Sequence, residues 1–137
     1  MRLVRSRSEG GASSRKRDTF VGEVWSDPVL QGIDGVTVNT IFFAPGARTY
    51  WHSHEHGQVL QVTGGAGWVC TRGGSPQPLA AGDTVWASAG EVHWHGADND
   101  SFLTHTATSL GATAWGDPVS DDDYAAVRGA RSGGSHV

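Results

Sequence analysis

Cysteine is almost missing from this chain of 137 residues, which contains only Cys70. A single thiol excludes an intrachain disulfide and any structural zinc site built from several cysteines. Cys70 lies in the apolar run Gly67–Thr71, which is typical of a strand, so we expect a buried thiol and not a nucleophile or ligand.

Long apolar runs are also absent, so no segment reaches the length that spans a membrane. Residues 1–17 contain six Arg or Lys and one acid but lack the apolar core of a secretory signal. We expect them to form a disordered basic tail, with a transit peptide or an over-extended start as alternatives. The other 120 residues contain four Arg and thirteen acids, which argues against nucleic-acid binding. The sequence therefore predicts a cytoplasmic protein that binds neither nucleic acid nor membrane.

Several common catalytic motifs are missing. His54-Glu55 is followed by His56-Gly57, so there is no His-Glu-x-x-His zinc motif. The chain also lacks a glycine-rich phosphate loop between a strand and a helix, and the Gly-x-Ser-x-Gly turn of serine hydrolases.

The sequence does contain many short β-like segments among 20 glycines. Asp27-Pro28 is expected to end the first strand, and Gly64-Gly65-Ala66 to form a hairpin turn. Roughly nine strands in one domain, residues 18–128, predict an all-β sandwich or jelly-roll barrel. Ser120 and the acids that follow it predict a short capped helix, and residues 129–137 a second disordered tail. The expected strands cover residues 19–25, 36–43, 58–63, 67–72, 83–87, 92–95, 102–109 and 111–115, and a ninth carries His52 and His54.

Two histidine pairs stand out within this pattern. His52 and His54 are two residues apart on a β-like segment, so they share one face about 7 Å apart along the strand. His93 and His95 repeat the arrangement, and the turn at Gly57 can return Gln58 toward the first pair. Neutral imidazoles and an amide oxygen on one face suit a divalent metal ion.

The spacing of these residues resembles the two motifs of the cupin superfamily. Gly46, His52, His54, Gln58 and Gly65 are similar to the first motif, although Gln58 stands where the family usually has Glu. The second motif is matched by Gly82, Gly90 and His93, whereas Ser88 and Ala97 replace the usual Pro and Asn. The resemblance implies a single-domain cupin jelly-roll β-barrel.

A narrower resemblance covers about residues 18–128, through stretches such as PGARTYWHSH, GQVLQVTGGAGW and GEVHWHGA. These stretches resemble single-domain bacterial cupins of the hydroxynitrile-lyase-like group. The resemblance implies a homodimer or larger homo-oligomer, and manganese as the cofactor, with iron, nickel or zinc as alternatives. It places the metal ligands at His52, His54, Gln58 and His93. It also implies a substrate pocket with residues Asn39, Ile41, Thr49, Leu60, His95, His105 and Ser109.

The remaining histidines differ in what they are expected to do. His95 and His105 are candidates for acid–base catalysis, with a packed core histidine as the alternative for each. His56 beside a turn is expected to be exposed, and His136 in the tail to have no role. The four tryptophans expected in the core or at a dimer interface are Trp51, Trp68, Trp86 and Trp94.

The functional prediction is a metal-dependent enzyme acting on a small organic molecule, first as a lyase of the hydroxynitrile-lyase type. A Gln in place of Glu makes the metal site one charge more positive, which favours anionic groups of the substrate. An iron-dependent dioxygenase or polyketide-modifying cupin is the second reading. A non-catalytic cupin that binds a small ligand is the third.

Overall fold

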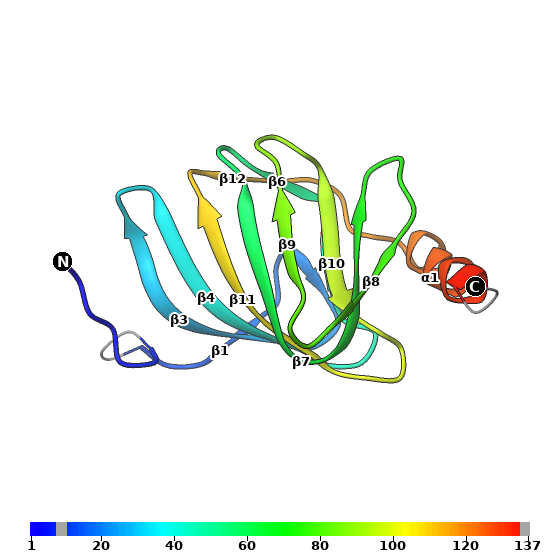
Figure 1. Ribbon diagram of the computed structural model, residues 1–137, viewed down its shortest axis with the longest axis horizontal. Coiled ribbons are helices and arrows are strands. Elements are labelled where there is room, and N and C mark those ends of the chain that lie inside the picture. Colours follow the sequence, from blue (N-terminus) through cyan, green and yellow to red (C-terminus); the bar gives the residue numbers. More distant parts are fainter. Residues whose placement is uncertain (8–10, 135–137) are drawn as a thin grey trace.

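The computed structural model describes residues 1–7 and 11–134, with side chains described as far as Ala130. Antiparallel strands form a nearly closed barrel, and one helix lies outside it (Figure 1). The fold is the expected all-β jelly roll. Its elements are β1 (Ser14–Lys16), β2 (Phe20–Val21), β3 (Val24–Ile33), β4 (Val36–Phe43), β5 (Arg48–Thr49), β6 (His52–His54), β7 (Gln58–Thr71), β8 (Gln77–Ala80), β9 (Thr84–Ala87), β10 (His93–Ala97), β11 (Leu103–Leu110), β12 (Thr113–Trp115) and α1 (Asp121–Gly134).

The barrel has two halves that share strand β7. The strands of sheet A lie in the order β1, β3, β4, β11, β7 and β9. Only the first part of β7 belongs to this sheet. Sheet B contains β2, β5, β6, β10, β12 and β8, and the last part of β7 pairs with β10 and β8. The interior between the two sheets holds both an apolar cluster and a group of buried polar residues.

Strand β7 corrects one sequence prediction, because Gly64-Gly65-Ala66 does not form a hairpin turn. The chain runs straight through these residues from sheet A into sheet B. Gly65 has φ +74°, and a Cβ on it would lie 1.9 Å from the carbonyl oxygen of Phe102. The glycine is therefore needed for close approach to the neighbouring backbone and for the irregular pairing with β11.

Strand β3 corrects a second prediction, because Asp27-Pro28 does not end it. Pro28 lies at a register shift in the pairing with β4, which is a position where a strand tolerates proline. On the opposite side, β1 pairs with Val24–Ser26 only. The missing amide hydrogen of Pro28 therefore removes no bond to β1.

The N-terminal segment is not wholly a disordered tail. Ser14–Lys16 form β1 against β3, so the prediction for residues 1–17 is wrong for this part. Arg7 also forms an ion pair of 2.7 Å with Asp27. Residues 8–10 lie outside the described residues.

Helix α1 packs on the outer face of sheet B. Val119, Tyr124 and Val127 cover Trp68 and Trp94 there, and Cys70 is buried in the same cluster as expected. The amide of Asp123 donates to Ser120 Oγ at 3.0 Å, which confirms the predicted N-cap.

The helix continues to Gly134, so the disordered tail expected from residue 129 is wrong as far as 134. Residues 135–137, which include His136, lie outside the described residues. None of the described helices has the length and apolar character needed to cross a membrane.

Trp51 also belongs to the buried cluster under α1. Trp86 is 56% exposed, so the expectation of core packing holds for the other three tryptophans and fails for this one. Its placement at a dimer interface remains a prediction.

Candidate metal centre

Antiparallel pairing of β6 with β10 brings the two histidine pairs together. His52 and His93 are direct partners in this pairing, so both pairs face the barrel interior. The ring centroid of His52 lies 4.3 Å from that of His93 and 5.0 Å from that of His54. Two sequence segments forty residues apart therefore form one cluster of buried imidazoles.

Gln58 joins this cluster because the chain turns sharply between β6 and β7. Gly57 has φ +101°, and a Cβ there would lie 2.4 Å from the ring of Trp86, so the turn requires glycine. The side chain of Gln58 is buried, and its Oε1 lies 3.2 Å from His93 Nε2. Gln58 Nε2 donates to Ser109 Oγ at 3.0 Å, which orients the amide so that its oxygen faces the histidines.

Hydrogen bonds to backbone carbonyls determine the tautomers of two histidines. His52 Nδ1 donates to the carbonyl of Tyr50 at 2.8 Å, and His93 Nδ1 donates to that of Glu91 at 3.0 Å. A carbonyl only accepts, so in a neutral ring Nδ1 carries the proton and Nε2 keeps a lone pair. The lone pair of His93 Nε2 then faces the oxygen of Gln58 with no proton between two acceptors.

His54 lies on the other side of the cluster, where a hydroxyl group, which can donate or accept, faces its Nδ1 atom. Its Nδ1 lies 3.1 Å from Thr113 Oγ1, and its Nε2 is buried without a hydrogen-bond partner among the described residues. An unpaired buried acceptor is costly unless a cation or donor occupies the space before it. Three imidazole Nε2 atoms and the amide oxygen of Gln58 thus have no hydrogen-bond donor, and this set of atoms fits a divalent metal ion. The Nδ1 atoms of the same histidines are held by neighbouring groups.

His95 and His105 form a second buried pair behind the first group. His95 Nδ1 lies 3.0 Å from His105 Nε2, whereas His95 Nε2 and His105 Nδ1 have no described partner. Nitrogens of His52, His93 and His95 lie within 4.8 Å of one another. The geometry therefore permits a second ligand set, with His95 in place of His54 and Gln58.

Burial keeps all five histidines neutral near pH 7. It lowers the pKa of His52 to about 3, with the nearby His93 as the next cause. It lowers the pKa of His54 and of His105 to about 4. The pKa of His93 is lowered by the same cause, and that of His95 falls well below 6.5 through burial and repulsion from His105. Neutral imidazole is the form that binds metal and accepts a proton.

A cavity of about 170 Å³ opens beside the cluster. Five of the expected pocket residues line it, namely Asn39, Ile41, Thr49, His95 and Ser109. Leu60 and His105 are completely buried and are not among the residues that line the cavity. His105 does not line the cavity, but it contacts His95, which does. His56, with 69% of its side chain exposed, lies outside the site as expected.

The sequence reasoning missed several residues of the cavity wall. Thr37 and Phe43 share a strand face with Asn39 and Ile41, and Ala107 shares one with His105, so alternation alone would have found these three. Phe20 and Trp115 come from the short strands β2 and β12. Local sequence patterns do not predict where such short strands lie in the barrel. The wall is completed by Gly111 and Thr113 together with three of the expected metal ligands, His52, His54 and Gln58.

Comparison with known proteins agrees with this architecture. Residues 39–104 match the cupin domain family. The chain is 42% identical over 113 residues to a protein named (R)-mandelonitrile lyase from Granulicella tundricola, covering 78% of this chain and 86% of that protein.

Solved structures give the same picture. A cupin-like protein from Thermotoga maritima superimposes with a TM-score of 0.79 at 37% identity, covering 82% of this chain and 90% of that one. A protein of that organism described as a predicted oxalate decarboxylase has a TM-score of 0.68 at 21% identity, covering 81% and 100% of the two chains, and shows the fold alone. The chain belongs to the cupin superfamily, in its hydroxynitrile-lyase-like group.

Proposed function

We propose that this protein is a metal-dependent lyase of the hydroxynitrile-lyase type, which cleaves a cyanohydrin into a carbonyl compound and hydrogen cyanide. The observation that carries the proposal is the unpaired, buried Nε2 of His95, a residue that lines a small cavity beside the convergent metal ligands. The 42% identity to a protein named (R)-mandelonitrile lyase supports this reaction class.

His52, His54, Gln58 and His93 would hold the ion, and manganese is the metal we propose. The ion, when bound, supplies positive charge that stabilises negative charge developing on the substrate oxygen. Thr113 and Ser109 contact His54 and Gln58 and orient these two ligands.

The protein's own groups move the proton. When His105 Nε2 accepts the Nδ1 proton of His95, the Nε2 atom of His95 keeps its lone pair. This nitrogen can take the proton from the substrate hydroxyl while the carbon–cyanide bond breaks and the carbonyl double bond forms. The departing cyanide then takes the proton from His95, which balances the reaction and restores the neutral imidazole.

The size and lining of the cavity restrict the substrate. Its volume of about 170 Å³ is below the range of about 300–1,000 Å³ for drug-sized ligands, so it suits one ring with short substituents. Phe20, Ile41 and Phe43 offer an apolar wall opposite the polar ligands. Asn39 and Ser109 add polar groups, so substrates with a further hydrogen-bonding substituent belong in the same test.

The test uses the protein reconstituted with manganese, and measures aldehyde and cyanide released from racemic mandelonitrile and from a panel of aliphatic and hydroxylated cyanohydrins. We expect release by the wild type, and a rate about 10²–10⁴-fold lower for His95→Gln with metal content unchanged. The matched control is His56→Gln, which changes an exposed histidine and should keep the wild-type rate.

Three results would contradict the proposal. Full metal occupancy without cleavage of any cyanohydrin would exclude the reaction. Oxygen uptake by the iron-loaded protein would instead favour a dioxygenase. Tight binding of a small molecule without turnover would favour a binding protein.

A further inference from the structure

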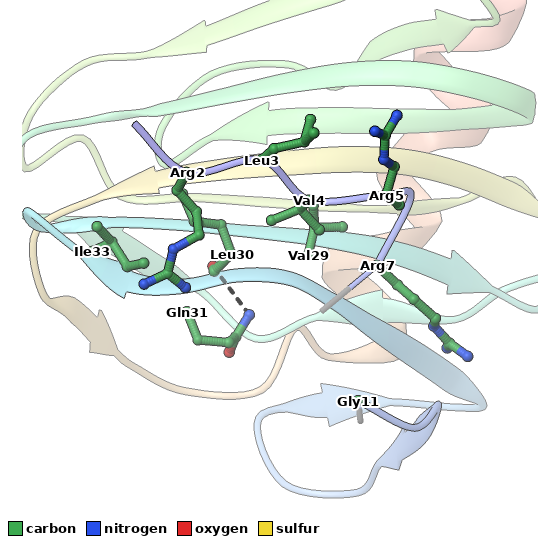
Figure 2. Close-up of a pocket in the computed structure, with 10 residues that line it drawn as sticks. All are labelled: Arg2, Leu3, Val4, Arg5, Arg7, Gly11, Val29, Leu30, Gln31 and Ile33. Carbon is green, nitrogen blue, oxygen red and sulfur yellow. Dashed lines mark hydrogen bonds between the residues drawn. The ribbon is translucent and has the colours of Figure 1, made fainter. Parts of the chain in front are cut away.

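Gln31, near the end of β3, forms hydrogen bonds that connect it to the wall of the cavity beside the histidines. Its Nε2 atom donates to Asn39 Oδ1 at 2.9 Å, and Asn39 lines that cavity. The same nitrogen lies 3.1 Å from the carbonyl oxygen of Leu30 and 3.4 Å from that of Val38. Figure 2 shows the bond to Leu30. Gln31 is exposed and does not line the cavity, but it contacts a residue that does.

These hydrogen bonds determine how both side-chain amides are turned. The oxygen and nitrogen of such an amide are distinguished by their hydrogen-bond partners. A backbone carbonyl only accepts, so the Gln31 atom that faces the carbonyls of Leu30 and Val38 is the nitrogen. An N–H group requires an acceptor, so the Asn39 atom that faces Gln31 is the oxygen. The Nδ2 atom of Asn39 therefore lies on the side of the planar amide that is turned away from Gln31.

The side chains next to Asn39 offer this nitrogen no fixed acceptor. Asn39 pairs with Pro28 of β3 and with Ala107 of β11, and Ile41 follows it on the same face of β4. None of these three side chains has an acceptor atom. The hydroxyl of Thr37, also on this face, can donate as well as accept. Among the described residues no hydrogen bond of Asn39 Nδ2 occurs, so its two N–H groups are available to a ligand in the cavity.

Asn39 lies across the cavity from the expected metal ligand Gln58. Gln58 pairs with Ser109 of β11, and Ser109 pairs with Thr37 of β4. Strands β7 and β4 are therefore two strand spacings apart, roughly 10 Å, and Asn39 is a further two residues along β4. A substrate that places its reacting carbon beside the metal ligands would thus meet Asn39 with its opposite end.

We propose that Gln31 and Asn39 make the cavity selective for substrates that carry a neutral hydrogen-bond acceptor, such as an ether or ketone oxygen, at the end away from the reacting carbon. Asn39 contacts the acceptor, and Gln31 is a positioning residue that turns the Asn39 amide. The inference rests on the proposed function, which defines the reacting end as a cyanohydrin or its carbonyl product.

The charge of the cavity wall restricts the acceptor to a neutral group. No Asp, Glu, Lys or Arg is among the residues that line the cavity, and burial lowers the pKa of its histidines below 6.5. A carboxylate beside Asn39 would therefore lose its hydration without gaining a cationic side chain as partner. An ether or ketone oxygen has a smaller cost of burial, which one N–H group of Asn39 can offset.

Calorimetric titration of the manganese-reconstituted full chain with two aldehydes tests the proposal. Para-methoxybenzaldehyde and para-ethylbenzaldehyde have nearly the same shape, and only the first has an acceptor at the far end of the ring. We expect the wild type to bind the methoxy compound about fivefold more tightly, which corresponds to one neutral hydrogen bond. Asn39→Leu removes both N–H groups at similar volume, so the ratio of the two dissociation constants should fall to about one.

Gln31→Met tests the positioning role separately. This variant removes the N–H group that holds Asn39 Oδ1, so the amide can turn and the ratio should also fall toward one. The affinity for the ethyl compound should stay at the wild-type level, whereas general damage to the cavity would weaken both ligands. The matched control is Gln61→Met, at an exposed position of β7, and it should keep the fivefold ratio.

The remaining outcomes overturn the inference. A wild type that binds both aldehydes equally, or neither of them, would exclude the selectivity. A Gln31→Met variant that keeps the full ratio would remove the role of Gln31. Failure of the lyase proposal gives a different result, because selective binding of the methoxy compound without cleavage of any cyanohydrin would refute the reaction and support the selectivity. Cleavage without selectivity would do the reverse.

Discussion

The interior of the barrel has two ends of opposite chemistry, one built from buried histidines beside the cavity and the other from apolar side chains. The same strands build both, since β10 contributes His93 to one end and Ala97 to the other. Likewise β11 contributes Ser109 to the histidine end and Leu103 to the apolar end. Alternation along a strand thus decides which side chains face inward, and position along the strand decides what they meet there.

The energetic consequences of the two ends also differ. Three buried nitrogens without a described partner, on His54, His95 and His105, all belong to the histidine end, where each costs about 1–3 kcal/mol unless a ligand or ion pairs it. At the apolar end, burial of a side chain such as Leu103 contributes about 1.5–3 kcal/mol. We infer that the apolar end stabilises the fold, and that the histidine end relies on it until a metal binds.

The largest expected effect is the loss of metal at the histidine end. His93→Ala removes the nitrogen that faces Gln58 Oε1, so metal content after reconstitution with manganese should fall from about one ion per chain to a trace. Elemental analysis after gel filtration measures it. His56→Ala is the control and should keep the ion, whereas a His93→Ala variant that retains one ion per chain would refute the ligand assignment.

Acid should destabilise the metal-free protein through the same end. The folded-state pKa values of five histidines lie below the unfolded value of 6.5, so the unfolded chain binds more protons once the pH falls below 6.5. This part of the stability is fully present above pH 6.5. It is lost as the pH falls toward 4 or 3, by about 1.4 kcal/mol per pH unit for each histidine at most. Urea unfolding of the metal-free protein should show several kcal/mol lost between pH 7 and pH 5, and a constant free energy of unfolding would contradict this account.

A substitution at the apolar end should separate stability from metal binding. Leu103→Ala leaves a cavity in the interior cluster and should lower the free energy of unfolding by about 2–5 kcal/mol. Its metal content should stay at the wild-type level, since Leu103 belongs to the far end. Leu3→Ala, at an exposed leucine, is the matched control for stability. Loss of the ion in Leu103→Ala, while the protein is still folded, would show that the two ends are not separable.

The smallest expected effect concerns the residue that orients Gln58. Ser109→Ala removes the acceptor of the Gln58 amide, so the amide can rotate and the manganese affinity should fall about 10–100-fold. Calorimetric titration measures the affinity, with Ser101→Ala as a control far from the site. An unchanged affinity would mean that Ser109 contacts Gln58 without positioning it.

Much of this site was predictable because it depends on local alternation. His52 and His54 share one strand face, as do Asn39 and Ile41, because side chains alternate along a strand. The spacing of the two cupin motifs relates the two histidine-bearing segments to each other. The position of His105 behind His95 was not predictable, because parity gives the face of a strand and not the layer at which a side chain lies.

The errors in the fold have a similar origin. A glycine pair is as typical of a close backbone contact as of a turn, and the sequence alone does not show that Phe102 lies beside Gly64 and Gly65. The pairing of Ser14–Lys16 with β3 comes from a tertiary contact that their polar sequence does not signal. Helix α1 also extends through a glycine-rich segment, a composition that does not signal a helix.

The most direct test of the metal centre is an anomalous-scattering map from crystals of the manganese-reconstituted protein. We predict one peak per chain, about 2.0–2.3 Å from Nε2 of His52, His54 and His93 and from Oε1 of Gln58. His95 should lie beyond bonding distance, with its Nε2 toward the cavity. A peak bonded to His52, His93 and His95 instead, or no peak inside the barrel, would contradict the account.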